Sequence, residues 1–561
     1  MKTNRVIKIF LASSEELEAD RYRFGNLIRK LDNIYEKRGI RIELFEWEDY
    51  DAAYNGMRKQ DEYNERVRAS DMFLALFHKK AGKFTIEEFN IARKAFDKQA
   101  SPKIYTYIKD LEAGESESRE LAEFKRLMLE ELGHYWCRYS NFDTMQLHFV
   151  LQLQMVEATT PIKVEVKESQ VKIGDSTIAD LNNVPFTSEN ATHRELQSRK
   201  EQLDREIGNA ESGGRRGFFG QRSRMTDEEL ANLREERESV TEQIERQEKA
   251  LVDTAMSIAR MQGGECSPRM RTAAELFEKG EIDKAEAVLK EDDMEADATN
   301  AKLKFDTAAQ PTAELTRNIE RCAGEYMLKA RIVVSGIADE SRYRQAVKLM
   351  STAIDLVSGR LPEETLAEYL FDYAVLLTDT GQQTKALETW ERLSGIYERL
   401  YRKAPQKYAY GYAGVLNNMA VLYSDKGDFD HCLSKYLKAI DIYDWLDREE
   451  PGIYDDDIAR LKNNLGTLYS DRDEYNKALS EFNEAARIRF ELLAKDNDPD
   501  SRSALADIYC NMATALQFSD HSQEALRYIA QAHAILDELD KEFPRIYEYK
   551  LYSILNREGS I

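Results

Sequence analysis

The sequence predicts an α/β domain at the N-terminus, a linker made of a small β-hairpin and a helical hairpin, and an all-α solenoid at the C-terminus. Three observations predict this order. Short apolar runs alternate with amphipathic segments over residues 1–155, two long charged helical segments dominate residues 156–265, and a pattern of small and large side chains recurs over residues 266–561. Because 561 residues exceed what one hydrophobic core organises, several domains are expected.

Composition and charge argue against several classes of function. The formal net charge is −23, from 103 acidic and 80 basic residues, which argues against broad binding of nucleic acids or anionic membranes. No uncharged stretch approaches the roughly 18 residues of a membrane span, and the first apolar run is too short for a secretory signal. The five cysteines lack CxxC spacing and the seven histidines lack HExxH, so we expect neither disulfides nor a metal site. These features predict a cytoplasmic protein.

Apolar runs in the N-terminal domain indicate buried parallel strands. They are "RVIKIFLA", "IRIELFEW", "DMFLALF", "KIYTYI" and, as a fifth, "HYWCRY". Their apolar residues are consecutive, as expected when helices cover both faces of a doubly wound sheet. Ligands of such sheets bind beyond the carboxyl ends of the strands. That edge contains "ASSEE" after the first run, "EDYD" after the second and "HKKAGKFT" after the third.

Two adjacent glutamates stand near the start of the helix predicted in "GKFTIEEFNIARKAF", residues 82–96. On a 3.6-residue period, Glu87 lies among polar and charged side chains, and we expect it to be solvated. Glu88 lies on the apolar face and is expected to be held against the domain. The apolar residues on the face of Glu88 are Phe84, Ile91, Ala92, Ala95 and Phe96. Alternatively, Thr85 and Glu88 form a T-x-x-E capping box that is purely structural.

The linker combines two kinds of signal. Residues 161–186 alternate polar and apolar positions around a Gly-Asp turn, which predicts the β-hairpin. Two long charged segments then flank the glycine-rich loop "GGRRGFFGQRSRM" within residues 213–225, which predicts a protruding or coiled-coil helical hairpin. Its tip is either a solvated loop or a contact for a partner or another copy of the chain. The tip residues are Arg215, Arg216, Phe218, Phe219, Arg222 and Arg224.

Repeats in the C-terminal half carry three positions in register. A small residue recurs at intervals of 46, 46 and 47 residues, at Ala374, Ala420, Gly466 and Ala513. Another small residue follows 12 residues later, at Ala386, Cys432, Ala478 and Ala525. A bulky residue follows 16 residues after the first, at Trp390, Tyr436, Phe482 and Ile529. Small residues at fixed offsets let two helices cross closely, and the bulky residue fills the neighbouring groove.

This pattern resembles the tetratricopeptide repeat over about half the chain, with a period longer than the usual 34 or so residues. An earlier unit contains Ala273 and Ala285 at the same offset. The resemblance implies a binding solenoid whose concave surface receives a peptide, a protein or another copy of the chain. Asparagines recur on the first helix of successive units, where they either bond a bound peptide or are ordinary surface residues. They are Asn417, Asn418, Asn463, Asn464 and Asn511.

The N-terminal segments "IKIFLASSEELEADR", "SDMFLALF" and "GKFTIEEFNIA" resemble the Toll/interleukin-1 receptor (TIR) domain in its divergent bacterial form. NAD-cleaving members carry the pattern Glu-aliphatic-x-x-Ala on a helix, and "EFNIA" matches it with Glu88 and Ala92, although Phe89 replaces the aliphatic residue. The resemblance implies a flavodoxin-like α/β fold, a catalytic role for Glu88, and NAD as a substrate with no bound cofactor.

Other side chains at the same sheet edge are candidates for binding NAD. Ser13 and Ser14 could bind ribose or phosphate, or simply cap the following helix. Trp47 could stack on a base or nicotinamide ring, or belong to the core. Positive charge for a pyrophosphate could come from Arg58, Lys59 and Arg66. Alternatively, these three residues form an exposed basic face of a helix. Neither GxGxxG nor GxxxxGK[ST] occurs, which disfavours a Rossmann site or a P-loop.

The sequence therefore predicts an NAD glycohydrolase or ADP-ribosyl cyclase, regulated by a repeat domain that senses a protein or peptide partner. By family resemblance, this architecture is similar to bacterial antiphage defence proteins that assemble as homo-oligomers. Two alternatives stay open. One is a non-catalytic TIR-like adaptor or scaffold. The other is an enzyme similar to nucleoside deoxyribosyltransferases, which also break an N-glycosidic bond with a carboxylate.

Overall fold

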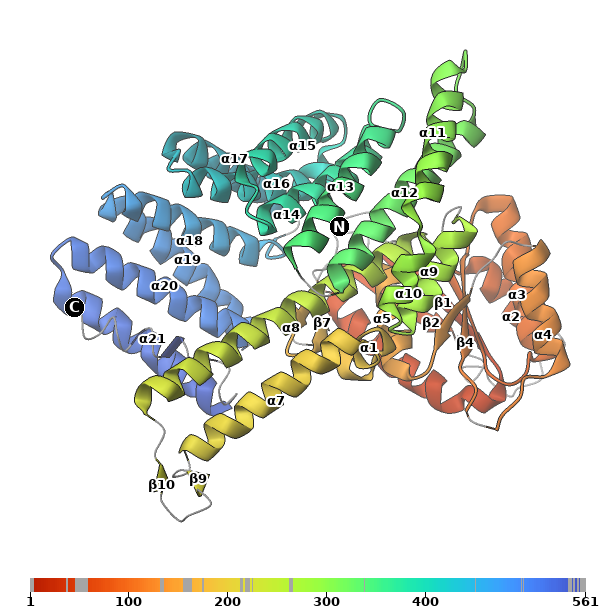
Figure 1. The fold of residues 1–561 in the computed structure, drawn as a ribbon, viewed down its shortest axis with the longest axis horizontal. Coiled ribbons are helices and arrows are strands. Elements are labelled where there is room, and N and C mark those ends of the chain that lie inside the picture. The colour runs from red at the N-terminus through yellow and green to blue at the C-terminus, as the bar shows by residue number, and fades with distance from the viewer. Residues whose placement is uncertain are drawn as a thin grey trace. The chain divides into compact units, whose positions relative to one another are not determined.

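The computed structural model describes most of the chain. The described residues are 5–36, 39–45, 59–112, 114–131, 136–154, 164–173, 176–211, 215–216, 222–223, 226–261, 266–336, 339–449, 451–495, 497, 499–542, 547, 550–551 and 554. Figure 1 shows the helices and strands along the chain, which divides into two compact units. The first unit comprises residues 1–157 and 161–360, and the second comprises residues 158–160 and 361–561.

A five-stranded parallel sheet begins the first unit, which confirms the predicted α/β architecture. The strands are β1 (Arg5–Ser13), β2 (Ile40–Phe45), β3 (Met72–Phe77), β4 (Lys103–Lys109) and β5 (Trp136–Tyr139), in the order β2-β1-β3-β4-β5. Every residue of β3 is buried, as its unbroken apolar run predicts for a central strand. The chain order reverses between β1 and β3, so this is the topological switch point of the sheet.

Helices cover both faces of the sheet. One core cluster joins the sheet to α1 (Glu18–Glu36) and α5 (Phe142–Leu153). A second joins it to α2 (Lys59–Ala69), α3 (Lys83–Gln99) and α4 (Arg119–Arg126). A 3-10 turn, η1 (Glu15–Leu17), leads into α1, and the wider turn η3 (Leu127–Glu131) follows α4. The side chains of Ser118 and Asn141 cap α4 and α5 by accepting backbone N–H groups, as their residue types favour.

The linker begins with a three-stranded antiparallel sheet, one strand more than the predicted hairpin. Its strands are β6 (Glu165–Lys167), β7 (Gln170–Ile173) and β8 (Ser176–Asp180). The added turn joins β6 to β7 through Glu168 and Ser169, whose φ angles of 53° and 57° are those of a two-residue hairpin turn usually made by Asn-Gly. Without that sequence the strand β6 is hard to predict. The predicted Gly-Asp turn, residues 174–175, lies outside the described residues.

Two long helices form the predicted helical hairpin. The short turns η4 (Leu181–Asn183) and α6 (Pro185–Ser188) lead into α7 (Ala191–Glu211), which lies alongside α8 (Asp227–Met261) in Figure 1. A small apolar cluster of Leu203, Val240 and Ile244 joins them. Two short strands, β9 (Arg215–Arg216) and β10 (Arg222–Ser223), pair near the tip. The tip side chains lie outside the described part, so the role of the tip stays a prediction.

Five described helices follow in the first unit. They are α9 (Pro268–Glu278), α10 (Ile282–Val288), α11 (Glu291–Thr307), α12 (Ala313–Ser335) and α13 (Glu340–Val357). Ala273 and Ala285, the small pair of the early repeat, are fully buried between α9 and α10.

Eight described helices form the second unit and confirm the predicted helical repeat array. They are α14 (Glu363–Asp379), α15 (Gln383–Lys403), α16 (Pro405–Asp425), α17 (Phe429–Glu449), α18 (Asp455–Asp471), α19 (Tyr475–Lys495), α20 (Pro499–Phe518) and α21 (Ser522–Glu542). All twelve repeat positions are buried. A Cβ on Gly466 would lie 2.6 Å from the ring of Phe482, which shows the small-against-large packing directly. Among the described residues, no helix combines the length and apolar content needed to cross a membrane.

The turns between paired helices share one backbone conformation. Gly381, Gly427, Asp473 and Asp520 recur at the repeat spacing, and their φ angles lie between 60° and 72°. The left-handed conformation suits glycine and strains a residue with a Cβ. We expect Asp520→Gly to raise the free energy of unfolding of the repeats by about 0.5–1 kcal/mol, and Gly427→Ala to lower it by about 1 kcal/mol. Urea denaturation measures both changes, and an unchanged stability in Gly427→Ala would contradict the explanation.

Candidate functional site

The carboxyl edge of the parallel sheet carries three of the sequence-predicted residues, namely Ser13, Ser14 and Glu88. Ser13 ends β1 and Ser14 follows it, on one side of the switch point. On the other side, β3 ends at Phe77, and the loop of residues 78–82 leads into α3, which carries Glu88. Helix α3 packs against β1, β3 and β4. Both groups of residues therefore belong to the edge at which ligands of doubly wound sheets bind.

Glu88 is buried, as predicted, with 8% of its surface exposed. The apolar face of α3 differs from the predicted one, because Phe84 and Phe96 are 55% and 45% exposed. The ring of Phe89 lies on the buried face instead and packs edge-on against Phe124, with 5.0 Å between ring centroids. The buried residues of α3 are Thr85, Glu88, Phe89, Ala92 and Ala95.

The capping-box alternative for Glu88 is wrong. Helix α3 begins at Lys83, and its N-cap residue is Gly82, which offers no side chain to cap the helix. Thr85 lies inside the first turn and cannot be the N-cap residue. Glu87, which was expected to be solvated, is partly exposed, and the buried Asn64 of α2 donates from Nδ2 to Glu87 Oε1 at 3.2 Å.

Ser13 and Ser14 are held by the buried Arg21 of α1. Arg21 Nη1 donates to Ser13 Oγ at 2.7 Å and to the carbonyl oxygen of Ser14 at 3.0 Å, and only 2% of Arg21 is exposed. Ser14 Oγ donates to Glu16 Oε1 at 3.3 Å. These bonds fix the loop after β1 at the switch point.

The neighbouring Asp20 holds the far side of the same edge. Its Oδ2 atom accepts from Lys109 Nζ at 2.9 Å and from Tyr139 Oη at 3.0 Å, at the ends of β4 and β5. Burial, followed by the charge of Asp20, raises the pKa of Tyr139 far above its usual value, so the phenol stays a donor. Sequence reasoning missed Asp20 and Arg21. The available signal was two adjacent charged residues between Leu17 and Phe24 on the buried face of an amphipathic segment.

The loop after β3 is rich in positive charge. Glu16 Oε1 accepts from the backbone N–H groups of Lys79 and Lys80 at 3.0 and 3.4 Å. Glu115 forms an ion pair with Lys79, and its Oε2 atom lies 3.2 Å from Nε2 of His78. The hydrogen bond from Lys79 lowers the pKa of Glu115 below its usual range. Part of the positive charge of this loop is thus neutralised by neighbouring carboxylates.

The four remaining sequence candidates have different outcomes. Trp47 and Arg58 lie outside the described residues, as does the side chain of Lys59, so their roles stay predictions. The guanidinium carbon of Arg66 lies 4.8 Å from the centroid of the Phe45 ring, at the end of β2. Arg66 is therefore an exposed cation stacked on an aromatic ring. No group of three His, Cys, Asp or Glu side chains in the described ranges could hold a metal ion.

Glu278, at the end of α9, is a titratable group near the fifth strand. Burial raises its pKa to about 7, and the charges of Glu275 and Asp110 add to the rise while Arg138 opposes it. Because the folded pKa exceeds the ordinary value of 4.5, the stabilising contribution of Glu278 is complete below pH 4.5 and is lost as the pH rises through 7.

Glu278→Gln should therefore raise the free energy of unfolding at pH 8 by about 1–2 kcal/mol, a value reduced for partial exposure, and change it little at pH 4. Denaturant titrations at the two pH values measure the difference. The exposed Asp283 of α10 provides the control Asp283→Asn, for which we expect a change in the free energy of unfolding of less than about 0.5 kcal/mol. Equal effects of Glu278→Gln at both pH values would contradict the raised pKa.

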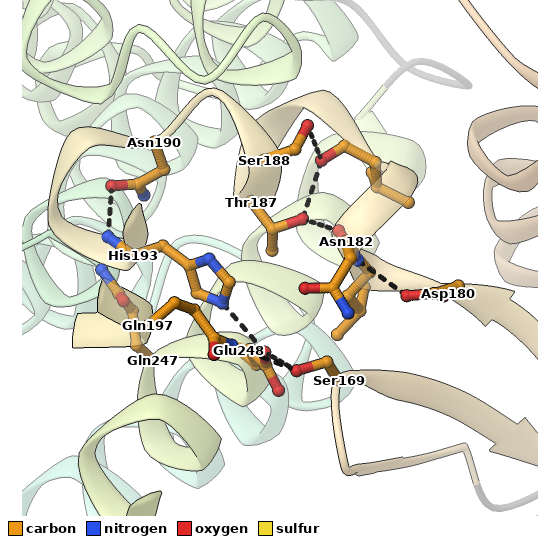
Figure 2. A network of polar contacts seen from close by, with 12 residues as sticks. Ser169, Asp180, Asn182, Thr187, Ser188, Asn190, His193, Gln197, Gln247 and Glu248 are labelled. Carbon is orange, nitrogen blue, oxygen red and sulfur yellow. Dashed lines mark hydrogen bonds and ion pairs between the residues drawn. The ribbon is translucent and has the colours of Figure 1, made fainter. Parts of the chain in front are cut away.

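A second buried polar network joins the three-stranded sheet to the helical hairpin (Figure 2). Glu248 of α8 is fully buried, and its Oε1 atom accepts from Ser169 Oγ at 2.6 Å and lies 2.9 Å from His193 Nε2 of α7. Gln247 Nε2 donates to the carbonyl oxygen of Ser335 at 3.4 Å, which ties α8 to α12. The network links the turn between β6 and β7 to α7 and α8, and we interpret it as structural.

Comparisons with known proteins give weak similarities. No protein-family model matches the chain, and no curated protein matches it significantly. Among solved structures, BtubC from P. vanneervenii is 19% identical, with a TM-score of 0.34 over 44% of this chain and 92% of that chain. The apo form of RapI is 16% identical, with a TM-score of 0.36 over 65% of this chain and 86% of that chain. A signal transduction ATPase with a tetratricopeptide repeat sensor from Pyrococcus horikoshii is 12% identical, with a TM-score of 0.31 over 99% of this chain and 93% of that chain. Similarities of this size do not assign the chain to a family.

Proposed function

We propose that the N-terminal domain is a TIR-type enzyme that cleaves the bond between nicotinamide and ribose in NAD, as a glycohydrolase or an ADP-ribosyl cyclase. One observation carries this proposal. Glu88 is a carboxylate that is 8% exposed, and it lies on the helix that follows the switch-point strand β3. A carboxylate at such a position costs solvation energy, and buried ionisable groups in ligand-binding regions are candidates for catalysis.

The chemistry of NAD cleavage needs this kind of group. As the bond to nicotinamide breaks, positive charge develops at the anomeric carbon of the ribose, as in the oxocarbenium-like transition states of glycosidases. Nicotinamide is already a good leaving group, so the enzyme has to supply negative charge and orientation. Water screens a carboxylate that is nine-tenths buried far less than an exposed one. In the proposed reaction Glu88 stabilises the cation, orients the ribose hydroxyl groups, or does both.

Ser13, Ser14 and Trp47 complete the proposed substrate site. The hydroxyl group of Ser13 is fixed by Arg21 at the switch point, which suits a group that positions ribose or phosphate. Trp47 is proposed, from its place in the sequence after β2, to stack on the base or the nicotinamide ring. The proposed roles of these three residues depend on the catalytic role of Glu88, and they are rejected if that role is rejected.

The repeat array is proposed to regulate this activity by binding a protein or peptide partner, as tetratricopeptide-type solenoids do. Exposed apolar side chains on its first helices support the proposal, since Phe371, Val421 and Phe518 are 36%, 40% and 65% exposed. The recurring asparagines support it less. Asn511 Nδ2 donates to Asn463 Oδ1 at 3.1 Å, so these two amides bond each other across neighbouring repeats.

Partner binding would assemble the chain into a homo-oligomer and deplete NAD, which suits antiphage defence. Substrate choice tests the enzyme assignment. The full chain should release nicotinamide from NAD and should leave 2′-deoxyinosine intact. Cleavage of the deoxynucleoside with NAD untouched would replace the proposal by a deoxyribosyltransferase activity.

A further inference from the structure

We propose that the loop after β3 and the first turn of α3 form a phosphate-binding site one helical turn from Glu88. The assignment of the pyrophosphate of NAD as the ligand rests on the proposed function. The assignment of an anion-binding site rests only on the geometry of the described residues 78–85.

The backbone at the start of α3 is open to an anion. The N-cap residue Gly82 has an extended conformation, with φ −62° and ψ 138°, and makes no side-chain cap. The N–H groups of the first helical turn have no partner within the helix, and the dipole of a 17-residue helix adds partial positive charge there. An uncapped helix start of this kind attracts phosphate oxygen atoms.

The hydroxyl group of Thr85 is a second feature that suits a phosphate ligand. Thr85 is 3% exposed, and within the described part of the chain its hydroxyl group makes no hydrogen bond. Its Oγ1 atom lies 3.3 Å from the place of a Cβ on Gly82, so the hydroxyl group faces the open N-cap position. The Thr85 oxygen atom is still reached by solvent, so it is open to a ligand, and an oxygen atom of a bound phosphate would accept a hydrogen bond from it here.

Charge around the helix start favours the same ligand. Lys80 and Lys83 are exposed and form no ion pair with another described residue, whereas Lys79 is engaged by Glu115. The backbone N–H groups of Lys79 and Lys80 already bind a carboxylate oxygen, that of Glu16, which shows that this loop turns its donors toward anions. Two free lysines at one helix start stand out in a chain of net charge −23.

The position of the site selects a class of substrate. Thr85 and Glu88 are three residues apart, so they lie on one face of α3, separated by about one turn. A substrate anchored by a phosphate at the helix start would place its sugar toward Glu88. The site therefore favours nucleotides and dinucleotides over nucleosides, which carry no phosphate.

Calorimetric titration of the full chain with inorganic pyrophosphate at low salt tests the site without turnover. The double variant Lys80→Gln/Lys83→Gln should weaken binding by about 10-fold or more, because it removes two charge-assisted contacts. The matched control is Lys94→Gln/Lys98→Gln, which removes two exposed lysines farther along α3 and should change affinity less than about 2-fold. Equal losses in both double variants, or no binding by the native chain at millimolar pyrophosphate, would overturn the proposal.

Thr85 provides the sharper test. Thr85→Val keeps the shape and removes the hydroxyl group, and it should weaken pyrophosphate binding by about 3–10-fold. Thr85→Ser keeps the hydroxyl group and should retain native affinity, whereas a loss as large as that in Thr85→Val would contradict the hydroxyl contact. A parallel titration with ADP-ribose identifies the source of the phosphate. Tighter binding of ADP-ribose than of pyrophosphate supports a dinucleotide ligand, and pyrophosphate binding alone keeps the anion site while removing its link to NAD.

Discussion

Glu88→Gln is expected to lower the rate of nicotinamide release from NAD by about 10³-fold, since it removes the negative charge beside the developing cation. Glutamine has nearly the same shape, so the packing of α3 against Phe124 through Phe89 should persist. We expect the free energy of unfolding to change by less than about 1 kcal/mol. The rate is measured by chromatography of nicotinamide, and the stability by thermal unfolding of the same preparations.

The adjacent Glu87 is the matched control for this prediction. It lies on the same helix, one residue away, and its carboxylate is held by Asn64 instead of facing the proposed substrate. Glu87→Gln should change the rate by less than about 3-fold. A comparable loss of rate in both variants would show that α3 tolerates no change of charge. It would contradict a specific catalytic role for Glu88.

Glu248→Ala is expected to lower the free energy of unfolding of the first unit by about 3–5 kcal/mol, because it leaves buried polar partners without an acceptor. His193 and Ser169 both contact Glu248 Oε1, and the three residues come from α7, α8 and the turn between β6 and β7 (Figure 2). The loss should therefore loosen the attachment of the helical hairpin to the small sheet. Chemical denaturation measures the stability, and hydrogen exchange locates the change.

Glu242 is the control for this second prediction. It lies on the same helix with 63% of its side chain exposed and pairs loosely with Arg246 at 3.5 Å. Exposed pairs of this kind contribute little, so Glu242→Ala should change stability by less than about 0.5 kcal/mol. A small effect of Glu248→Ala would mean that the network of Figure 2 is not what attaches the hairpin.

Elements with a strong local or periodic signal could be predicted from the sequence. The strand β3 is an unbroken apolar run and is fully buried, and the repeat positions such as Gly466 and Phe482 are in contact at the predicted offset. In both cases side chains close in sequence, or equivalent in successive repeats, carry the signal. The strand β6 was not predicted as a separate strand, because the turn after it places Glu168 and Ser169 in a conformation that their residue types do not predict.

The candidate site was predicted in part. The burial of Glu88 follows from its place on an amphipathic helix. The same periodicity predicted that Phe84 and Phe96 are buried, which is wrong, because the period contains no information about which side chains of the rest of the domain pack against the helix. Asp20 contacts Lys109 and Tyr139, which are 89 and 119 residues away in sequence. Glu248 likewise meets Ser169 across 79 residues. Contacts over such separations depend on the tertiary fold and leave no spacing pattern in the sequence.

The central claim, that this chain cleaves NAD, is tested most directly by following NAD and nicotinamide in a solution of the purified full chain. The protein is used at high concentration with a molecular crowder, because the proposed regulation requires assembly. We predict that NAD is consumed and that nicotinamide accumulates in equal amount. NAD that remains intact under these conditions, while the chain is folded and assembled, would contradict the account.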